Sequence, residues 1–245
     1  TEEDSGLRIR VYDKGNDNYM LILQLTALAG DMVTIQKLAA EIKAIYLGIN
    51  EREDAEEAIQ YTQFAEWQHE LITSPDEAAS DFWQTASFEK GNEYSLPFAN
   101  YETAGGVFKP AVTTLTPSAG ACRALMMLEK NGTPADMMLM ACFYILLQRY
   151  FNSEETTIGF AAIGREYDEL KDITGLLSTT LPVLIKPVAG ETVMDLVKRL
   201  EEQTQKVKEY GEYFSWPAGD QNNSVPYFRS IYEYSEINAK SVSVN

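Results

Sequence analysis

The sequence contains little cysteine, almost no histidine and few positive charges for its length. Its 245 residues include two cysteines, one histidine, and 20 Lys and Arg against 37 Asp and Glu, which gives a formal net charge of −17. A chain this acidic is repelled by nucleic-acid phosphates and by anionic membrane surfaces, so neither is expected as a partner. No apolar run reaches the ~20 residues of a membrane-spanning helix. Metal ligands are not clustered, and we expect no bound metal.

Both cysteines lie among apolar residues of predicted helices. Cys122 follows Ala121, and Cys142 lies between Ala141 and Phe143. This setting predicts buried structural thiols rather than a disulfide or a nucleophile, and hence a cytoplasmic protein. The polar N-terminus lacks an initiating Met and an apolar signal region, so we expect the sequence to be a piece of a longer chain.

The spacing of apolar residues predicts strands that alternate with helices, which indicates an α/β fold with a large core. We expect a hairpin over residues 7–25, with a partly exposed first strand and a buried second strand. Further strands are expected at 111–115, 156–161, 180–185, 227–234 and 241–244. Helices are expected at 31–48, 59–71, 74–83, 116–129, 133–150 and 192–210. The segment 91–110, rich in Gly, Pro and Asn, is expected to cross between two lobes.

Four segments form an ordered set of motifs along the chain. The first is the turn Thr26-Ala27-Leu28-Ala29-Gly30-Asp31-Met32, between the predicted hairpin and helix. The second is Tyr61-Thr62-Gln63-Phe64-Ala65-Glu66-Trp67. The third joins Gly159-Phe160-Ala161-Ala162-Ile163-Gly164-Arg165 to Thr174-Gly175-Leu176-Leu177-Ser178-Thr179-Thr180-Leu181-Pro182. The fourth is Tyr210-Gly211-Glu212-Tyr213-Phe214-Ser215-Trp216.

These motifs resemble those of the condensation domains of nonribosomal peptide synthetases. The family patterns are His-His-x-x-x-Asp-Gly, Tyr-x-Asp-Phe-Ala-x-Trp, a Gly-Arg loop with Gly-Phe-Phe-x-Asn-Thr-Leu-Pro, and His-Gln-Asp-x-Pro-Phe-Glu, of which the fourth is barely preserved here. Thr26 and Ala27 stand in the places of the two histidines, Gln63 replaces the acid, and Thr179 stands in the Asn position. The family's opening motifs and final Arg-containing motif are not found. The chain thus resembles the middle of a condensation domain.

The resemblance implies a two-lobed α/β fold like that of chloramphenicol acetyltransferase. Residues 1–98 would form the later part of the N-terminal lobe, which contains the motif turn, and residues 99–245 most of the C-terminal lobe. The chain would cover only part of each lobe. The motif turn is then expected at the interface of the lobes, beside a tunnel for the arms of carrier proteins.

The chemistry implied by the family depends on a histidine. Joining an amine to an acyl thioester needs proton removal by a group that titrates near neutral pH. The resemblance places that histidine at Ala27, which has no titratable atom, and the hydroxyl of Thr26 cannot act as a base without its own activator. His69 lies beside charged neighbours on a predicted helix and is interpreted as a surface or boundary residue. The catalytic residue is therefore unassigned, with Thr26, Ala27 and Asp31 as the motif-equivalent positions.

Asp31 matches the family motif, where the equivalent carboxylate pairs with an arginine of the other lobe. The matching arginine here is Arg165, so the resemblance implies a structural contact between Asp31 and Arg165. A buried pair of this kind fixes geometry, because removal of either partner leaves a charge without compensation. Asp31 can equally cap the helix that follows it, and the two roles are compatible.

Three functions remain open from the sequence. The first is a condensation-type acyltransferase that joins carrier-bound acyl or peptidyl and aminoacyl thioesters. The second is a non-catalytic module that docks carrier proteins or recruits a tailoring enzyme. The third is a heterocyclisation-like variant, whose motif is Asp-x-x-x-x-Asp-x-x-Ser. The corresponding residues here are Thr26, Asp31 and Thr34, and Thr34 and Thr179 are possible tunnel or variant-motif positions.

The implied partners are donor and acceptor carrier proteins and neighbouring synthetase domains. No cofactor is expected in the chain itself, since phosphopantetheine arms of the carriers hold the substrates.

Overall fold

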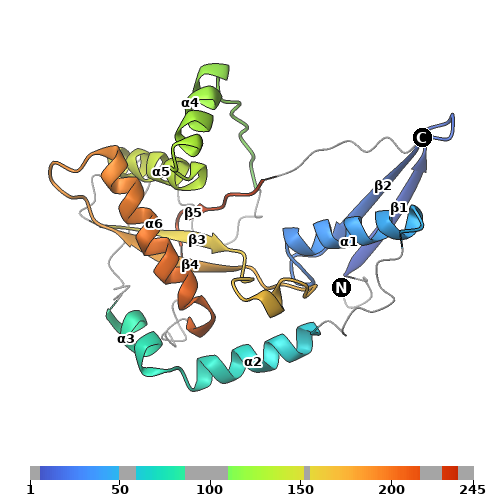
Figure 1. Cartoon of the computed structure of the whole chain (residues 1–245), viewed down its shortest axis with the longest axis horizontal. Coiled ribbons are helices and arrows are strands. Elements are labelled where there is room, and N and C mark those ends of the chain that lie inside the picture. The colour runs from blue at the N-terminus through green and yellow to red at the C-terminus, as the bar shows by residue number, and fades with distance from the viewer. Residues whose placement is uncertain (1–5, 50–58, 86–109, 152–154, 216–227, 237–245) are drawn as a thin grey trace, which may run out of the picture. The chain divides into compact units, whose positions relative to one another are not determined.

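The computed structural model describes residues 6–49, 59–85, 110–151, 155–215 and 228–236 (Figure 1). Their element order is β1 (Leu7–Asp13), β2 (Tyr19–Leu25), α1 (Met32–Tyr46), α2 (Tyr61–Thr73), α3 (Glu77–Thr85), α4 (Ala119–Lys130), α5 (Ala135–Phe151), β3 (Thr156–Ala162), η1 (Asp168–Leu170), β4 (Thr179–Ile185), α6 (Val193–Glu209), η2 (Gly211–Tyr213) and β5 (Ile231–Tyr232). The predicted α/β class is confirmed. Within the described part of the chain, no helix is long and apolar enough to cross a bilayer.

The chain divides into two compact units. The first unit comprises residues 1–83, 162–180 and 208–219, and the second comprises 84–161, 181–207 and 220–245. Strand β3 and strand β4 therefore carry the chain from one unit to the other. The predicted lobe boundary after residue 98 lies outside the described residues and stays a prediction.

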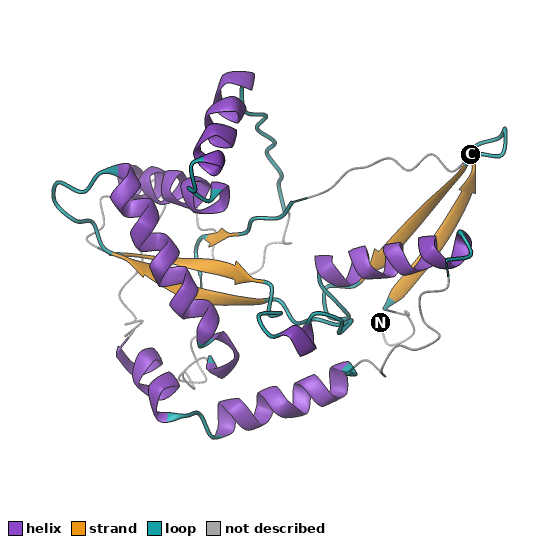
Figure 2. Cartoon of the chain, viewed as in Figure 1, coloured by secondary structure: helices purple, strands orange, loops and turns teal. Residues whose placement is uncertain are grey.

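In the first unit, β1 and β2 form the predicted antiparallel hairpin, in a register that pairs Leu7 with Leu25 and Asp13 with Tyr19. The prediction that the second strand is buried is wrong, because Tyr19 is 59% exposed and Leu21 43% exposed. The described strands of this unit form a two-stranded sheet with α1 beside β2 (Figure 2). An apolar run predicts a strand, but it cannot tell how many layers cover that strand.

In the second unit, the sheet has the order β4-β3-β5, and β3 runs parallel to β5. Helices α5 and α6 supply much of the core, and α6 lies beside β4, because Gln203 Nε2 donates to the carbonyl oxygen of Leu184 at 3.3 Å (Figure 2). The core consists of apolar side chains from both helices and two strands: Met137, Met140, Ala141, Tyr144, Leu147, Ile158, Phe160, Leu181, Val183, Ile185, Leu196, Val197, Leu200 and Val207. Burying such a set is the main favourable contribution to folding.

Several expectations differ from the structure. Both cysteines are exposed, so the prediction of buried thiols is wrong. Residues 111–115 form no strand, and Val112 is 90% exposed. The strand predicted over 227–234 is reduced to β5. The predicted crossover at 91–110, apart from its last residue, and the predicted strand at 241–244 lie outside the described residues. The predicted helices are all present, with their ends shifted by a few residues.

Candidate functional site

The motif turn connects β2 to α1 in the first unit. The N–H of Thr26 donates to the carbonyl oxygen of Gly6 at 2.9 Å, and the N–H of Ala29 donates to the carbonyl oxygen of Thr26 at 2.9 Å. Gly30 is buried, and an added Cβ would lie 2.6 Å from Cδ2 of Leu25, so that side chain would have to move. The turn is therefore held to the hairpin at its start and packed tightly at its end.

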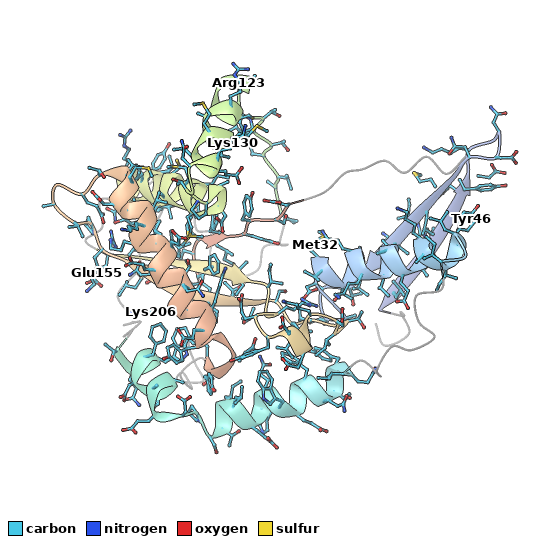
Figure 3. All side chains as sticks on the ribbon, in the orientation of Figure 1. Met32, Tyr46, Arg123, Lys130, Glu155 and Lys206 are labelled. Atoms are coloured by element: carbon cyan, nitrogen blue, oxygen red, sulfur yellow. The ribbon has the colours of Figure 1, made fainter. Side chains whose placement is uncertain are left out.

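Asp31 caps α1, whose two ends are marked by Met32 and Tyr46 in Figure 3. Oδ1 of Asp31 accepts a hydrogen bond from the N–H of Thr34 at 2.9 Å, and the Thr34 hydroxyl lies 2.9 Å from the same oxygen. A carboxylate at this position satisfies a helix N–H that has no partner within the helix. The capping role expected for Asp31 is therefore present.

Asp31 also pairs with Arg165. Nη1 of Arg165 donates to Oδ2 of Asp31 at 2.7 Å, and Nη2 donates to Oδ1 at 3.2 Å. These two hydrogen bonds make the pair bidentate. Both side chains are only 5% exposed, so the pair is also buried. The structure thus brings Asp31 and Arg165 together as expected from the sequence. Both residues belong to the first unit, and their role between two lobes stays a prediction.

The same carboxylate binds the loop before β4. Oδ2 of Asp31 accepts the N–H of Leu177 at 3.2 Å and the N–H of Ser178 at 3.1 Å. Arg165 binds the same loop, since its Nη2 donates to the carbonyl oxygens of Ile173 and Gly175, each at 3.3 Å. One ion pair therefore joins the motif turn, the start of α1 and the loop 173–178.

Thr34 completes this arrangement. Its hydroxyl lies 2.7 Å from the carbonyl oxygen of Gly175 and accepts the N–H of Gly175 at 3.0 Å. We call Asp31, Thr34, Arg165 and the backbone of 173–178 the Asp31 network. Sequence reasoning gave Thr34 only a variant-motif role and missed this contact. The signal was its position one helical turn after the capping Asp31, on the same side of α1. Thr179, at the start of β4, is half-buried and does not belong to the network.

The electrostatics of the site favour an ionised Asp31. Burial by itself raises the pKa of Asp31, but hydrogen bonds from Arg165 and from the N–H of Thr34, with the charge of Arg165, outweigh it and hold the pKa below its ordinary value. Asp31 is therefore a structural anion. It is poorly suited to accept a proton from a substrate near neutral pH, because its lone pairs are occupied by five donor groups.

The motif positions that would carry the histidines are exposed. Thr26 and Ala27 both lie on the surface of the turn, and the methyl group of Ala27 can neither accept nor donate a proton. His69 is exposed on α2, which confirms its interpretation as a surface or boundary residue. Within the described ranges, no group of three or more His, Cys, Asp and Glu side chains is arranged to hold a metal ion.

Sequence reasoning also missed Glu212, in the fourth motif segment. Glu212 is 5% exposed, and its Oε2 accepts a hydrogen bond from Nε2 of Gln68 on α2 at 2.7 Å. Burial raises the pKa of Glu212, Gln68 partly opposes that rise, and the charge of Glu166 adds to it. This carboxylate ties the segment after α6 to α2. Trp216, the last residue of the fourth motif segment, lies outside the described residues.

The chain is similar to known proteins in sequence and in fold. Over 216 residues the chain is 26% identical to gramicidin S synthase 2 of Aneurinibacillus migulanus, an alignment that covers 84% of the chain and 5% of that protein. The crystal structure of the X-domain from teicoplanin biosynthesis superposes with a TM-score of 0.66 at 22% identity, over 86% of this chain and 49% of that one. A four-domain nonribosomal peptide synthetase bound to AMP and glycine gives a TM-score of 0.68 at 21% identity, over 84% of this chain and 16% of that one.

The fold is thus the α/β fold of condensation domains, and the chain spans about half the length of the single condensation-type domains that it matches. The family described as the condensation domain matches residues 2–215, which is most of the sequence. The chain belongs to the condensation-domain family.

Proposed function

We propose that this chain is part of a condensation domain of a nonribosomal peptide synthetase, which joins two carrier-bound thioesters by holding them together rather than by using a histidine base. The observation that carries this proposal is the Asp31 network. It holds the motif turn through a buried ion pair, whereas the residue at the catalytic position, Ala27, has no titratable atom. The residues that hold the motif turn are therefore present, and alanine stands where the family motif has its histidine.

In the proposed reaction the amine nitrogen of the acceptor attacks the acyl carbon of the donor thioester. The new C–N bond forms as the C–S bond breaks, and the proton lost by nitrogen ends on the departing thiolate of the donor arm. Holding both reactants in one site can lower the barrier by roughly 7–11 kcal/mol, without any protein group that accepts a proton. The partners are then donor and acceptor carrier proteins with phosphopantetheine arms, and neighbouring synthetase domains.

The assignment of lobes belongs to the same proposal. Residues 1–98 would contribute the later part of the N-terminal lobe and residues 99–245 most of the C-terminal lobe, with the arms entering a tunnel beside the motif turn. A cytoplasmic location is consistent with two free thiols, because reducing compartments keep cysteines unpaired.

A second candidate function is a docking module that binds carrier proteins or a tailoring enzyme without chemistry. The exposed, non-titratable side chain at Ala27 favours it, since general acid–base catalysis needs a group that changes its protonation state.

The heterocyclisation-like alternative has less support. Its motif would assign chemistry to Asp31 and Thr34, whose polar atoms are already engaged in the Asp31 network.

Single-turnover transfer between loaded donor and acceptor carrier proteins separates these functions. The protein that contains this chain is compared with Ala27→His and with the control Leu28→His, which places an imidazole on the neighbouring residue, 90% exposed. Catalysis by positioning predicts transfer by the native protein and a gain of about 10²-fold in Ala27→His alone, with a pH profile that gains an ionisation near neutral pH.

Three other results of the transfer experiment would reject part of the proposal. No transfer by the native protein, with carrier binding intact in a calorimetric titration, would reject catalysis and leave the docking function. No transfer and no binding of either carrier would reject both functions. Equal effects of the two histidine variants would show that the residue-level match of Ala27 to the family's catalytic position is wrong.

A further inference from the structure

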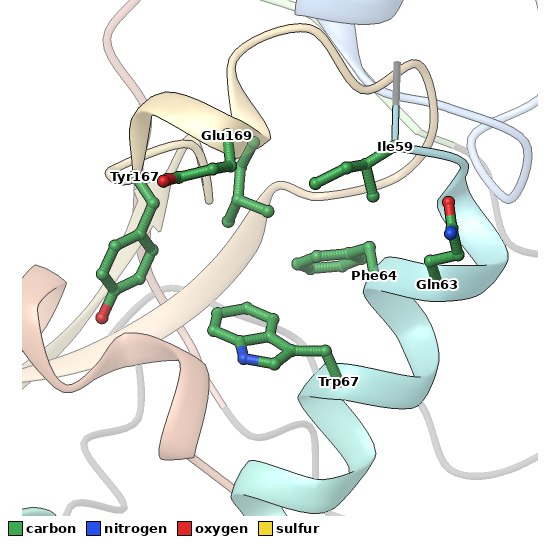
Figure 4. Close-up of a pocket in the computed structure, with 7 residues that line it drawn as sticks. Ile59, Gln63, Phe64, Trp67, Tyr167 and Glu169 are labelled. Atoms are coloured by element: carbon green, nitrogen blue, oxygen red, sulfur yellow. The ribbon is translucent and has the colours of Figure 1, made fainter. Parts of the chain in front are cut away.

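The first unit contains a pocket whose lining residues do not belong to the Asp31 network. Its volume is about 360 Å³, and it is formed by α2 on one side and by the segment 167–170 on the other. Figure 4 shows the rings of Phe64 and Trp67 extending from α2 toward the segment that carries Tyr167 and Glu169. A volume of this order is within the range of pockets that bind small molecules.

The inner wall of the pocket is apolar and packed against a buried cluster. Phe64 is 2% exposed and Leu170 is 5% exposed, and both belong to a buried cluster with Ile173 and Leu177, against which Trp67 packs. Ile173 and Leu177 lie in the loop that the Asp31 network holds by its backbone. The wall is therefore formed before any ligand arrives, which lowers the entropic cost of binding.

Aromatic rings form the side of the pocket. The ring of Trp67 meets the ring of Tyr167 edge to face, with centroids 5.8 Å apart, and the centroids of Phe64 and Trp67 are 5.9 Å apart. Aromatic faces attract cations through their quadrupole, and indole does so most strongly. Three such rings around one cavity favour a ligand that combines an apolar body with a positive charge.

The edge of the pocket is negatively charged. Glu169 lines the pocket and is exposed, which places a carboxylate at the opening. Residues 166–172 carry four carboxylates, of which Asp168 pairs with Lys171 and Asp172 pairs with Lys37, so the local excess of negative charge comes from Glu166 and Glu169. The whole chain has a net charge of −17, so its field adds to the local attraction for cations and repels anions.

We propose that this pocket is a binding site for a small organic cation, an amine carried on an aromatic or alkyl body. The apolar body would lie against Phe64, Trp67 and Leu170, and the ammonium group would face Glu169 beside the ring of Tyr167. The site uses none of the side chains of the Asp31 network. It therefore stands whether or not the domain catalyses condensation.

Phenethylammonium is a suitable probe, and 2-phenylethanol is its neutral control of similar size. Binding to the full chain is measured from shifts of the tryptophan indole N–H signals and from saturation transfer to the probe. We expect phenethylammonium to bind, and we expect the affinity for 2-phenylethanol to be lower by about fivefold or more. A single charge at a pocket edge changes affinity by this order.

Three variants test the placement of the ligand. Glu169→Gln is expected to weaken phenethylammonium about fivefold and to leave 2-phenylethanol unchanged. Glu70→Gln removes the same charge from an exposed residue of α2 that does not line the pocket, and it should change neither affinity appreciably. Ile59→Trp adds bulk at the pocket edge, where Ile59 is 38% exposed, and should abolish binding of both probes.

The proposal is overturned by any of three results. One is the absence of phenethylammonium binding to the unmodified chain. Another is equal binding of the charged and neutral probes, which would make the pocket merely apolar. The third is an equal effect of Glu169→Gln and Glu70→Gln, which would reduce the charge preference to the overall field of the protein.

Discussion

Asp31 combines two roles at the scale of a single residue, because one carboxylate caps α1 and compensates the buried charge of Arg165. We expect Asp31→Asn to lower the free energy of unfolding by about 3–5 kcal/mol, since Arg165 would keep a buried charge without a counter-charge. The matched control is Asp172→Asn, which breaks the pair between Lys37 and Asp172, whose side chain is 84% exposed. That change should cost less than about 1 kcal/mol. Urea titrations of both variants check this, and similar losses would contradict the structural role of Asp31.

Single residues were predictable from the sequence where a motif or a charge fixed their contacts. The pairing of Asp31 with Arg165 followed from the family motif, and the exposure of His69 from its charged neighbours. The exposure of Cys142 was not predictable in this way. Helix α5 is apolar on most of its circumference, and its buried stripe runs through Met137, Met140, Ala141, Tyr144 and Leu147, which leaves Cys142 outside. Periodicity cannot select the buried face of a helix that has few polar residues.

At the scale of elements, the loop before β4 approaches the segment after β3 so closely that a glycine is required. Gly164 has φ +67°, and an added Cβ would lie 1.9 Å from the carbonyl oxygen of Leu177. We expect Gly164→Ala to lower the free energy of unfolding by more than about 3 kcal/mol, because backbone strain and a collision with the main chain add together.

The control for that prediction is Gly132→Ala. Gly132 ends α4 with φ +85°, and no atom lies within 4 Å of an added Cβ, so only the backbone strain remains. The expected cost is about 1–2 kcal/mol, measured by thermal and urea unfolding of both variants. A loss in Gly164→Ala no larger than that in Gly132→Ala would show that the two loops separate easily.

Elements were predictable where their own side chains determine them. The helices and the hairpin were found because helical periodicity, caps and a Gly-containing turn are local signals. The strand at 111–115 was wrong for the opposite reason. A strand needs hydrogen bonds from a neighbouring strand. None of the described strands pairs with residues 111–115, where Val112 and Leu115 are 90% and 87% exposed. The contact of Thr34 with Gly175, separated by 141 residues, was equally out of reach of local signals.

For the whole molecule, two buried carboxylates give opposite contributions to the pH dependence of stability. The pKa of Asp31 is below its ordinary value, so its contribution is complete above that ordinary value and is lost as the pH falls through the pKa of the folded state. The pKa of Glu212 is above its ordinary value of 4.5, because burial disfavours its charge. The folded state then binds more protons than the unfolded state, and stability falls as the pH rises from that value through the raised pKa.

The net charge of −17 acts in the same direction as Glu212, since self-repulsion among carboxylates grows as they ionise. We therefore expect the chain to be most stable at mildly acidic pH. The substitution Glu212→Gln is expected to leave the free energy of unfolding unchanged near pH 4.5 and to raise it by about 1 kcal/mol at pH 8. At pH 8 the substitution removes a buried charge, and the glutamine side chain still offers an acceptor to Gln68. Urea unfolding from pH 4.5 to 8 measures this difference, with the exposed Glu70→Gln as the control for loss of one charge. Parallel pH curves for the unmodified chain and Glu212→Gln would mean that the Glu212 carboxylate is as well solvated in the folded state as in the unfolded one.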